Sequence, residues 1–302
     1  MSPVGGSLGL ESNLNHRAFS VYAESWSNVW IGTAGGINKT TDGGKSWVKF
    51  NHTNQSSPIS GNFVVALRMQ SFRGRSIMWA GTRYAEGLTE KQGASYSEDG
   101  GQTWKTSLIG EFCHNLGFRD SIAYAVTDDG IFRSSDLGTT WSESGTIYDR
   151  NSKQRVTSSQ FYAVDTYGDD IWFGGSDGTV HTTDNATNPF GLSWSILHAA
   201  KPLSSNHSTY AYPNPFSPDD EVVRFHYAVG YGYAKVTIRI FDFGMNLVRT
   251  VISNAGRDGT SESDEIWDGR DDNRRQVANG PYFYEIVVGN DDPIWGKILV
   301  LQ

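Results

Sequence analysis

The sequence predicts an all-β protein in two parts: four-stranded repeat units over the first two thirds, then an antiparallel β-sandwich. The first observation is composition, since 34 Gly, 10 Trp and 14 Tyr accompany only 4 Met among 302 residues. Such a chain suits short strands joined by tight turns, because long helices favour Ala, Leu, Glu and Lys. The other two observations are a recurring Asp-Gly-Trp pattern and, after it, runs in which apolar residues alternate with polar ones.

The charge of the chain argues against a polyanionic partner. The 25 Lys and Arg against 33 Asp and Glu give a net charge of −8, whereas nucleic acids and anionic membrane surfaces bind clustered basic side chains. The first ten residues have neither a basic start nor a long apolar run, so we predict neither a signal peptide nor a membrane span there. We expect no nucleic-acid partner, and we expect that the start of the protein is missing or that the chain is a processed piece.

Residues that could hold a metal or cofactor are few. Cys113 is the only cysteine, which excludes an intrachain disulfide and a cysteine-based zinc cluster, and we expect it to be a small buried side chain. His114, His181 and His207 are scattered, and neither a Gly-rich phosphate loop nor a nucleophile elbow occurs. The sequence therefore predicts no cofactor and no metal.

A repeated motif occurs in three clear copies between residues 40 and 141. In each copy a Ser or Thr precedes an Asp by two positions, a Gly follows the Asp by two, and a Trp follows that Gly by three. The three copies contain Asp42, Gly44 and Trp47; Asp99, Gly101 and Trp104; and Asp136, Gly138 and Trp141. A looser fourth copy has Asp184 and Trp194, which lie ten residues apart where the others are separated by five.

The repeat extends upstream of each motif. A Gly lies six residues before every Asp, and an aromatic residue lies six residues before that Gly in three of the four copies. In the second copy Trp79 lies fourteen residues before Gly93, because eight residues are inserted within 83–92. Each unit therefore reads as strand, turn, strand, Asp-containing turn and strand, and an earlier apolar run such as 19–21 or 161–164 supplies a fourth strand.

The motif has a structural explanation that requires no ligand. An Asp side chain can accept hydrogen bonds from backbone N–H groups one or two residues further on, and a Gly two positions later tolerates a positive φ. The Trp then enters the following strand and can pack its large face against a neighbouring sheet. We therefore interpret the Asp residues of the four copies as parts of hairpin turns and not as metal ligands or acids.

The pattern S/T-x-D-x-G-x-S/T-W resembles the Asp-box, or BNR, repeat of sialidases, sortilin-type receptors, photosystem assembly factors and some glucanases. The resemblance covers about residues 15 to 200 and implies a β-propeller, whereas it implies little about function because the motif belongs to the scaffold in all of these proteins. Propellers of this family usually have six or more blades, and open blade edges need closure. We expect further blades upstream of these four, and a closed four-bladed ring is the alternative.

A different pattern begins after the repeats. Residues 201–209 are polar and predict a linker, and prolines within 212–218 exclude a helix and a central strand. Alternating runs then follow at residues 222–227, 236–242, 247–251, 282–288 and 296–300. They predict an antiparallel sandwich of about seven short strands over residues 210–302, after blades over residues 1–200.

This sandwich resembles the immunoglobulin-like domain of the flagellar hook-capping protein FlgD and the C-terminal sorting domains of type IX secretion. The residues that carry the resemblance are Tyr-Pro-Asn-Pro-Phe at 212–216, Ile-Phe-Asp-Phe-Gly at 240–244, Trp-Asp-Gly-Arg-Asp at 267–271, and residues 277–284. Pro281 departs from the small or branched residue that is commoner there. The resemblance implies export and attachment at a bacterial surface, with secretion or surface-attachment machinery as partner.

An acidic cluster in the sandwich could suggest calcium. Asp268, Asp271 and Asp272 lie close in sequence, and carboxylates in a turn can gather oxygen ligands around Ca²⁺. Their spacing does not match the calcium loop Asp-x-Asn/Asp-x-Asn/Asp-Gly. We therefore interpret them as a solvated turn with Trp267 packed beneath it.

Strand order determines which loops share a rim of the propeller. The Asp-containing turn joins the third and fourth strands of each unit, so the turn between the second and third strands and the connections between blades lie at the opposite rim. Propellers generally bind ligands through loop-built faces and the central channel. We expect the ligand-binding face at this opposite rim, formed by Arg83, Tyr84, Glu86, Asp128, Asp129 and Asp177 with the long connection of residues 142–160.

An enzymatic function is the alternative to binding. A glycoside hydrolase needs two carboxylates about 5 to 10 Å apart, or a Tyr nucleophile with an acid partner. Glu86, Asp128 and Asp165 are candidates, although sequence spacing does not show that any two converge, and the Arg-Ile-Pro signature and arginine triad of sialidases are absent. The sequence therefore predicts an exported, extracellular or cell-surface binding protein for a polysaccharide or protein ligand, with no catalytic residue, and a hydrolase fragment as the alternative.

Overall fold

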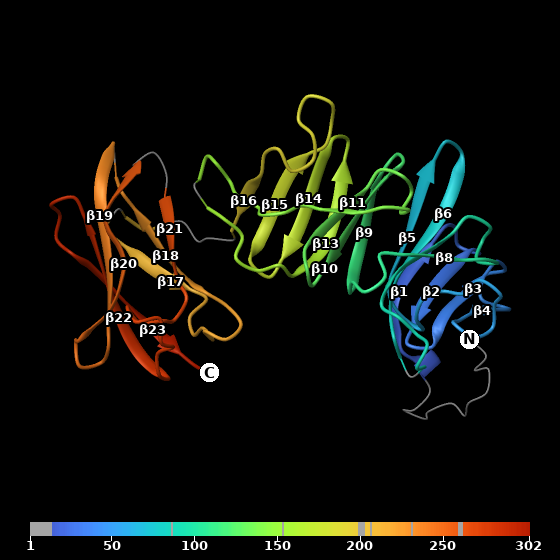
Figure 1. Ribbon diagram of the computed structural model, residues 1–302, viewed down its shortest axis with the longest axis horizontal. Coiled ribbons are helices and arrows are strands. Elements are labelled where there is room, and N and C mark those ends of the chain that lie inside the picture. The colour runs from blue at the N-terminus through green and yellow to red at the C-terminus, as the bar shows by residue number, and fades with distance from the viewer. Residues whose placement is uncertain are drawn as a thin grey trace. The chain divides into compact units, whose positions relative to one another are not determined.

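The computed structural model describes residues 14–85, 87–152, 154–198, 203–205, 207–230, 232–258 and 262–302. Two compact units divide the chain, Met1–His198 and Ala199–Gln302 (Figure 1). The described residues form β-strands, turns and one short 3-10 helix, η1 (Leu14–His16). The predicted all-β class is therefore confirmed.

Four antiparallel sheets of four strands make up the first unit, and in each sheet the strands neighbour one another in chain order. Blade 1 contains β1 (Ala18–Ala23), β2 (Val29–Thr33), β3 (Gly36–Thr40) and β4 (Val48–Phe50). Blade 2 contains β5 (Phe63–Phe72), β6 (Arg75–Arg83), β7 (Gly93–Ser97) and β8 (Lys105–Ser107). Blade 3 contains β9 (Cys113–Arg119), β10 (Ile122–Thr127), β11 (Ile131–Ser134) and β12 (Ser142–Glu143). Blade 4 contains β13 (Phe161–Tyr167), β14 (Asp170–Gly175), β15 (Gly178–Thr183) and β16 (Ser195–Leu197), so the prediction of four-stranded blades is confirmed.

The first strands of successive blades form a common seam. Strand β1 packs against β5, β5 against β9, and β9 against β13. No comparable packing joins β13 to β1, both of which lie wholly within the described residues. The four blades therefore do not close into a ring through their first strands, and the alternative of a closed four-bladed ring is not seen.

Aromatic side chains fill the first two interfaces between blades. Trp30 on β2 meets Trp104, the motif Trp of blade 2, edge to face with ring centroids 6.5 Å apart. Trp79 on β6 meets Trp141, the motif Trp of blade 3, in the same way at 6.3 Å. Trp30 and Trp79 are both fully buried. The second-strand aromatic of one blade therefore packs against the motif Trp of the next, which explains why both recur in the sequence.

The three clear motif turns share one hydrogen-bond pattern. In the first, Asp42 Oδ1 accepts hydrogen bonds from Ser46 N at 2.9 Å and Thr40 Oγ1 at 2.8 Å, and Asp42 Oδ2 accepts one from Ser46 Oγ at 2.6 Å. Gly44 N donates to Thr40 Oγ1, and the φ of Gly44 is 88°, a left-handed conformation that favours glycine. The Asp thus bonds the residue four positions further on, whereas the sequence suggested one or two.

The fourth motif copy differs from the other three. Asp184 is 4% exposed, and its Oδ2 accepts hydrogen bonds from Tyr124 Oη at 2.5 Å and Arg133 Nε at 2.6 Å, both from blade 3. Trp194 packs edge to face on Phe190 at 5.6 Å inside the cluster between blades 3 and 4. Asp184 Oδ1 also accepts a hydrogen bond from Phe190 N at 3.3 Å, within its own turn. Asp184 therefore serves both its turn and a buried ion pair between blades.

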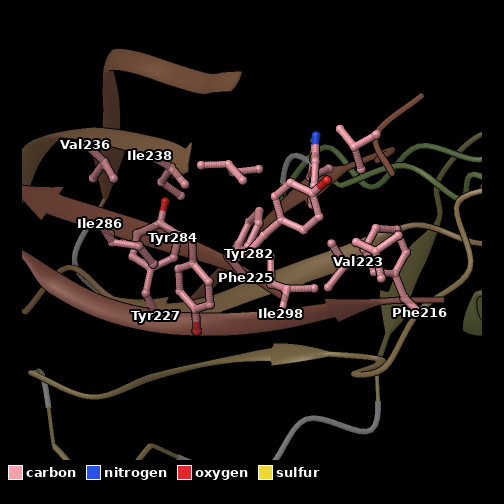
Figure 2. Packing of buried hydrophobic residues seen from close by; sticks show 14 of the residues in the cluster. Phe216, Val223, Phe225, Tyr227, Val236, Ile238, Tyr282, Tyr284, Ile286 and Ile298 are labelled. Carbon is pink, nitrogen blue, oxygen red and sulfur yellow. The ribbon is translucent and has the colours of Figure 1, made fainter. Parts of the chain in front are cut away.

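The second unit is a sandwich of two antiparallel sheets. One sheet has the order β17 (Thr209–Tyr212), β18 (Val223–Ala228), β21 (Glu262–Trp267). The other has the order β20 (Leu247–Asp258), β19 (Tyr233–Phe241), β22 (Gly280–Val288), β23 (Ile294–Val300). Figure 2 shows side chains of β18, among them Phe225 and Tyr227, facing Tyr284 and Ile286 of β22 across one shared core. The predicted sandwich of about seven strands is confirmed.

The acidic turn after β21 is held by its own backbone. Asp271 Oδ1 accepts hydrogen bonds from the N–H groups of Asn273 and Arg275, both at 2.8 Å, and Asp268 Oδ1 accepts one from Arg270 N at 3.1 Å. Trp267 is 2% exposed beneath them. Asp272 Oδ1 accepts a hydrogen bond from Thr250 N. Each carboxylate therefore has a partner within the fold, as a turn requires.

Candidate functional site

The rim opposite the motif turns gathers ends of strands from three blades. Strand β6 ends at Arg83, β9 begins at Cys113, β10 ends at Thr127 and β13 begins at Phe161. Because neighbouring strands are antiparallel, the end of β10 lies beside the start of β9, and Thr127 pairs with Cys113. The loops that leave these points can therefore combine side chains from different blades.

Four side chains form a continuous row along this rim. The Arg83 guanidinium lies 4.1 Å from the ring centroid of Phe112. The Phe112 ring lies 4.1 Å from the His114 ring, and His114 meets Tyr162 edge to face at 4.9 Å. We call these four residues the rim row. It runs from blade 2 through blade 3 to blade 4, so it depends on the stacking of blades and not on any single sheet.

Asp128 fixes the imidazole at the centre of the rim row. Asp128 Oδ1 lies 2.8 Å from His114 Nε2, and since a carboxylate only accepts, the imidazole nitrogen donates. Ser159 Oγ donates to the Asp128 carbonyl oxygen at 2.7 Å, which ties the β10–β11 turn to the connection that leads into β13. Tyr162 is the second residue of β13, so its ring lies at the start of blade 4, and 45% of Tyr162 is exposed.

Arg83 lies at the other end of the rim row, where its guanidinium stacks on aromatic rings. Its guanidinium lies over Phe112 and, at 5.9 Å, over Tyr84, which is 56% exposed. Among the residues that the structure describes, the buried Nε of Arg83 has no hydrogen-bond partner. A cation stacked on aromatic rings is stabilised by their faces and leaves its N–H edges available. Arg83 is partly exposed, so the terminal N–H groups of its guanidinium can donate to an acceptor on a ligand.

Glu90 organises the insertion that follows Arg83. Its carboxylate accepts hydrogen bonds from the backbone N–H groups of Asn62 at 3.0 Å, Ala85 at 2.7 Å and Gly87 at 3.0 Å. These bonds connect the inserted loop to the connection between blades 1 and 2. The insertion is thus an ordered part of the rim in its described residues, and Glu86, a predicted site residue, lies outside them.

A second group at this rim is acidic. Burial, followed by the neighbouring Asp129 carboxylate, raises the pKa of the Glu111 carboxyl group, and Glu143 adds to the effect. A raised pKa favours the protonated form of a carboxyl group, which can donate a hydrogen bond. This shift distinguishes Glu111 as a candidate acid at this rim.

The remaining predicted residues occupy other environments. Asp177 Oδ2 accepts hydrogen bonds from Thr157 N at 2.6 Å and Thr157 Oγ1 at 2.7 Å, and only 11% of its side chain is exposed. Asp177 thus holds the long connection before blade 4 against the β14–β15 turn. Asp165 pairs with Trp172 within the sheet of blade 4, away from the strand ends that form the rim.

The structure therefore joins Arg83 to Asp128 through two residues that the sequence did not select for the site. Phe112 and His114 flank the first residue of β9, and Tyr162 follows the first residue of β13. Alignment of the first strands of the repeats would have placed His114 and Tyr162 at equivalent positions, each the second residue of its strand. Glu111 could not have been found in this way, because its pKa depends on Asp129 from a different hairpin.

Three further features concern metal ligands, the single thiol and membrane-spanning helices. Within them no group of three or more His, Cys, Asp or Glu is arranged to hold a metal ion. Cys113 is fully buried, as expected, and burial raises the pKa of its thiol to about 12. In the part of the chain that the structure describes, no helix has the length and apolar character needed to cross a membrane.

Comparison with known proteins gives likenesses among solved structures only. No family model and no curated protein matches the chain. The chain is similar to PorZ, a bacterial surface component of the type-IX secretion system of Porphyromonas gingivalis, with 12% identity and a TM-score of 0.31, over 95% of this chain and 45% of PorZ. It is similar to YCF48 bound to D1 peptide, with 17% identity and a TM-score of 0.40, over 98% of this chain and 81% of that one.

A third similar structure is an enzyme. An ancestral GH74 enzyme shares 15% identity with a TM-score of 0.44, over 93% of this chain and 31% of the enzyme. The chain thus spans less than half the length of PorZ and of the GH74 enzyme. At such identities a likeness concerns fold and not ligand or activity. These structures include a surface component, a peptide complex and an enzyme, so they do not decide between binding and catalysis.

Proposed function

We propose that this chain is an exported, cell-surface binding protein that recognises a polysaccharide or protein ligand through the rim opposite the motif turns. The observation that carries the proposal is the rim row. Its cation, aromatic rings and imidazole come from three blades, and Tyr84 and Tyr162 remain about half exposed beside them. Exposed aromatic rings next to an arginine are the residue types that dominate binding energy at recognition surfaces.

The chemistry of the rim row defines what it can hold. Tyr84 and Tyr162 offer faces for sugar rings or for apolar and aromatic side chains, and Arg83 offers N–H donors for a carboxylate or hydroxyl. His114 is oriented by Asp128 and keeps its ring edge against Tyr162. A ligand that crosses several blades would contact all of these groups at once.

An array of polysaccharides and peptides probed with the purified 302-residue chain tests this proposal. For a ligand found on the array, we expect Tyr162→Ala and Arg83→Ala each to weaken binding by roughly 5- to 30-fold, the effect of losing 1 to 2 kcal/mol. Tyr233→Ala is the matched control, because Tyr233 is 72% exposed but lies in the sandwich. Equal loss for Tyr162→Ala and Tyr233→Ala would contradict the placement of the site.

The glycoside hydrolase alternative is favoured by one observation, the raised pKa of Glu111 beside Asp129. A carboxyl group with a raised pKa is one requirement for the acid in glycoside hydrolysis. We expect no release of reducing ends from any polysaccharide bound on the array. Release that disappears in Glu111→Gln or Asp129→Asn, while binding remains, would establish the hydrolase instead.

We further propose that the C-terminal unit serves for sorting or anchoring, with residues 1–200 as the blades, 201–209 as the linker and 210–302 as the sandwich. The motifs at 212–216 and 267–271 support this, since Phe216 and Trp267 both lie in the sandwich core. Expression behind a secretion signal in a bacterium with type IX secretion tests it. The full chain should reach the cell surface, whereas a chain that ends at residue 209 should remain inside; equal surface display of both would contradict the proposal.

A further inference from the structure

Blade 4 carries an uncovered aromatic face. In β14, β15 and β16, the side chains of Ile171, Phe173, Val180 and Ile196 are buried in the cluster between blades 3 and 4. Since successive side chains of a strand point to opposite faces, Trp172, His181 and Leu197 lie on the face turned away from blade 3. Trp172 is 42% exposed and Leu197 is 46% exposed. We call these three residues the blade-4 outer face.

The blade-4 outer face repeats a cross-strand pair whose aromatic member is buried in every other blade. Trp172 on β14 is the cross-strand neighbour of His181 on β15, and their rings lie 4.5 Å apart. The pairs at the same register in blades 1 to 3 are Trp30 and Lys39, Trp79 and Tyr96, and Tyr124 and Arg133. The second-strand aromatics of those three pairs are at most 1% exposed. The position is therefore built for burial, and blade 4 alone leaves it open.

What covers the first three pairs is always the motif turn of the next blade. Trp30 meets Trp104 and Trp79 meets Trp141, as described above. Lys39 Nζ also donates to the Gly100 carbonyl oxygen of the blade-2 turn at 3.1 Å. Tyr124 donates to Asp184 of the blade-4 turn. The occupant that fits the blade-4 outer face is thus another motif turn with the sheet behind it.

Blade 1 carries the complementary face. Its motif turn is folded like that of blade 2, with Trp47 Nε1 donating to the Gly44 carbonyl oxygen at 3.1 Å. Trp47 belongs to none of the hydrophobic clusters formed by the described residues, whereas Trp104 belongs to one. Behind it, Val21 pairs with Ile31 on the face turned away from blade 2, and Val21 is 67% exposed. We call Val21, Ile31 and Trp47 the blade-1 outer face.

Part of the blade-1 outer face is already occupied. Asn15 of η1 accepts a hydrogen bond from Asn38 Nδ2 at 2.9 Å on this side of the sheet. Asn15 lies near one end of β3, while Val21 and Trp47 remain accessible beside it. The contact of η1 thus narrows the face without covering the motif Trp.

We propose that the blade-4 outer face binds the blade-1 outer face of a second copy of this chain, so that the stack of blades continues from one molecule to the next. The contact is heterologous, and two such contacts would join two copies into a ring of eight blades, a number within the range of closed propellers. The support is continuity with three interfaces of the same construction within one chain. This proposal is independent of the ligand proposed for the rim.

Sedimentation and light scattering of the 302-residue chain test the proposal. At tens of micromolar protein we expect a species with twice the mass of one chain. Trp172→Asp and Val21→Asp should each weaken self-association by about tenfold or more, because each places a charge in an apolar contact. Tyr233→Asp, at a 72% exposed position in the sandwich, is the control that should leave the mass unchanged. Circular dichroism of each variant shows whether its sheets are retained.

A mixture of the two variants sharpens the test. Val21→Asp keeps an intact blade-4 outer face and Trp172→Asp keeps an intact blade-1 outer face, so an equimolar mixture should recover one heterologous contact and form a mixed pair. Failure of the mixture to associate, when the unmodified chain does, would overturn the heterologous arrangement. A monomeric unmodified chain would overturn the second copy as occupant, and a blade from a longer form of the chain would then be the occupant.

Discussion

The two rims of the first unit follow opposite rules. At the motif rim, the N–H groups of Ser46, Thr103 and Thr140 each donate to the motif Asp at 2.9 Å, so three turns repeat one geometry. At the opposite rim, the second and third strands are separated by two residues in blade 1 and by the long insertion between Arg83 and Gly93 in blade 2. Repetition marks the part that builds the scaffold, and variation marks the part that is free to acquire a ligand.

The largest expected change in the free energy of unfolding comes from a residue between the two rims, where the blades stack. Trp79→Ala should reduce the free energy of unfolding by about 3 to 5 kcal/mol, because it removes a fully buried indole between blades 2 and 3. Urea denaturation followed by circular dichroism measures this. Trp26→Ala is the matched control, since Trp26 is 86% exposed and should change stability little. Similar losses for the two variants would contradict the stacking account.

The second largest change in stability is expected at Asp184, the Asp of the fourth motif copy. Asp184→Ala should cost about 3 kcal/mol, because Arg133 and the Tyr124 hydroxyl would be left without their buried acceptor. Asp169→Ala is the control, since Asp169 is 46% exposed in its ion pair with Arg119 and exposed pairs contribute little. A loss below about 1 kcal/mol for Asp184→Ala would show that the ion pair does not hold blades 3 and 4 together.

A smaller effect is expected on the stability of the fold at low pH. Hydrogen bonds from the Ser46 hydroxyl and N–H lower the pKa of Asp42 from 3.8 to about 2, and those from Thr140 do the same for Asp136. Since the folded pKa lies below the unfolded one, the stabilisation is present above about pH 4 and is lost as the pH falls toward 2. The double variant Asp42→Asn with Asp136→Asn should flatten the dependence of stability on pH in that window. If stability depended on pH in the same way in the double variant, the Asp residues of these turns would not contribute to acid denaturation.

The smallest effect on stability is expected at the rim row. Asp128→Asn should change the free energy of unfolding by less than about 0.5 kcal/mol, because the bond to His114 lies at a partly exposed position. The same variant should weaken ligand binding, since the imidazole would lose its fixed orientation. Denaturation and titration with the array ligand, done on one preparation, compare the two. If Asp128→Asn lowered stability and left ligand affinity unchanged, Asp128 would belong to the scaffold and not to the binding site.

The sequence predicts most of the scaffold because the scaffold is local. A Ser or Thr, an Asp and a Gly within five residues close a turn by themselves. In the sandwich, the alternation of apolar and polar residues predicts which side of each strand faces the core. Strand β21 was missed, because Glu-Ser-Asp-Glu-Ile-Trp is too polar to read as a strand and is held by its pairing with β18. Sandwich packing, and not local propensity, decided that segment.

The candidate site was predicted less completely, because its contacts are not local. Arg83 and Asp128 were selected from their places in loops, but their connection passes through Phe112 and His114, and Arg83 reaches the Phe112 ring only when blades 2 and 3 stack. The role of Asp184 likewise depends on Arg133, fifty-one residues earlier in the chain. These contacts form between blades, so they cannot be predicted from a motif that lies within one turn.

Hydrogen exchange of the chain with and without its array ligand tests the assignment of the two rims most directly. We expect ligand-induced protection in residues 83–85, 111–115, 127–130 and 160–163, with the turns at 42–47, 99–104 and 136–141 unchanged. Protection confined to those three turns would contradict the account and place recognition on the motif rim.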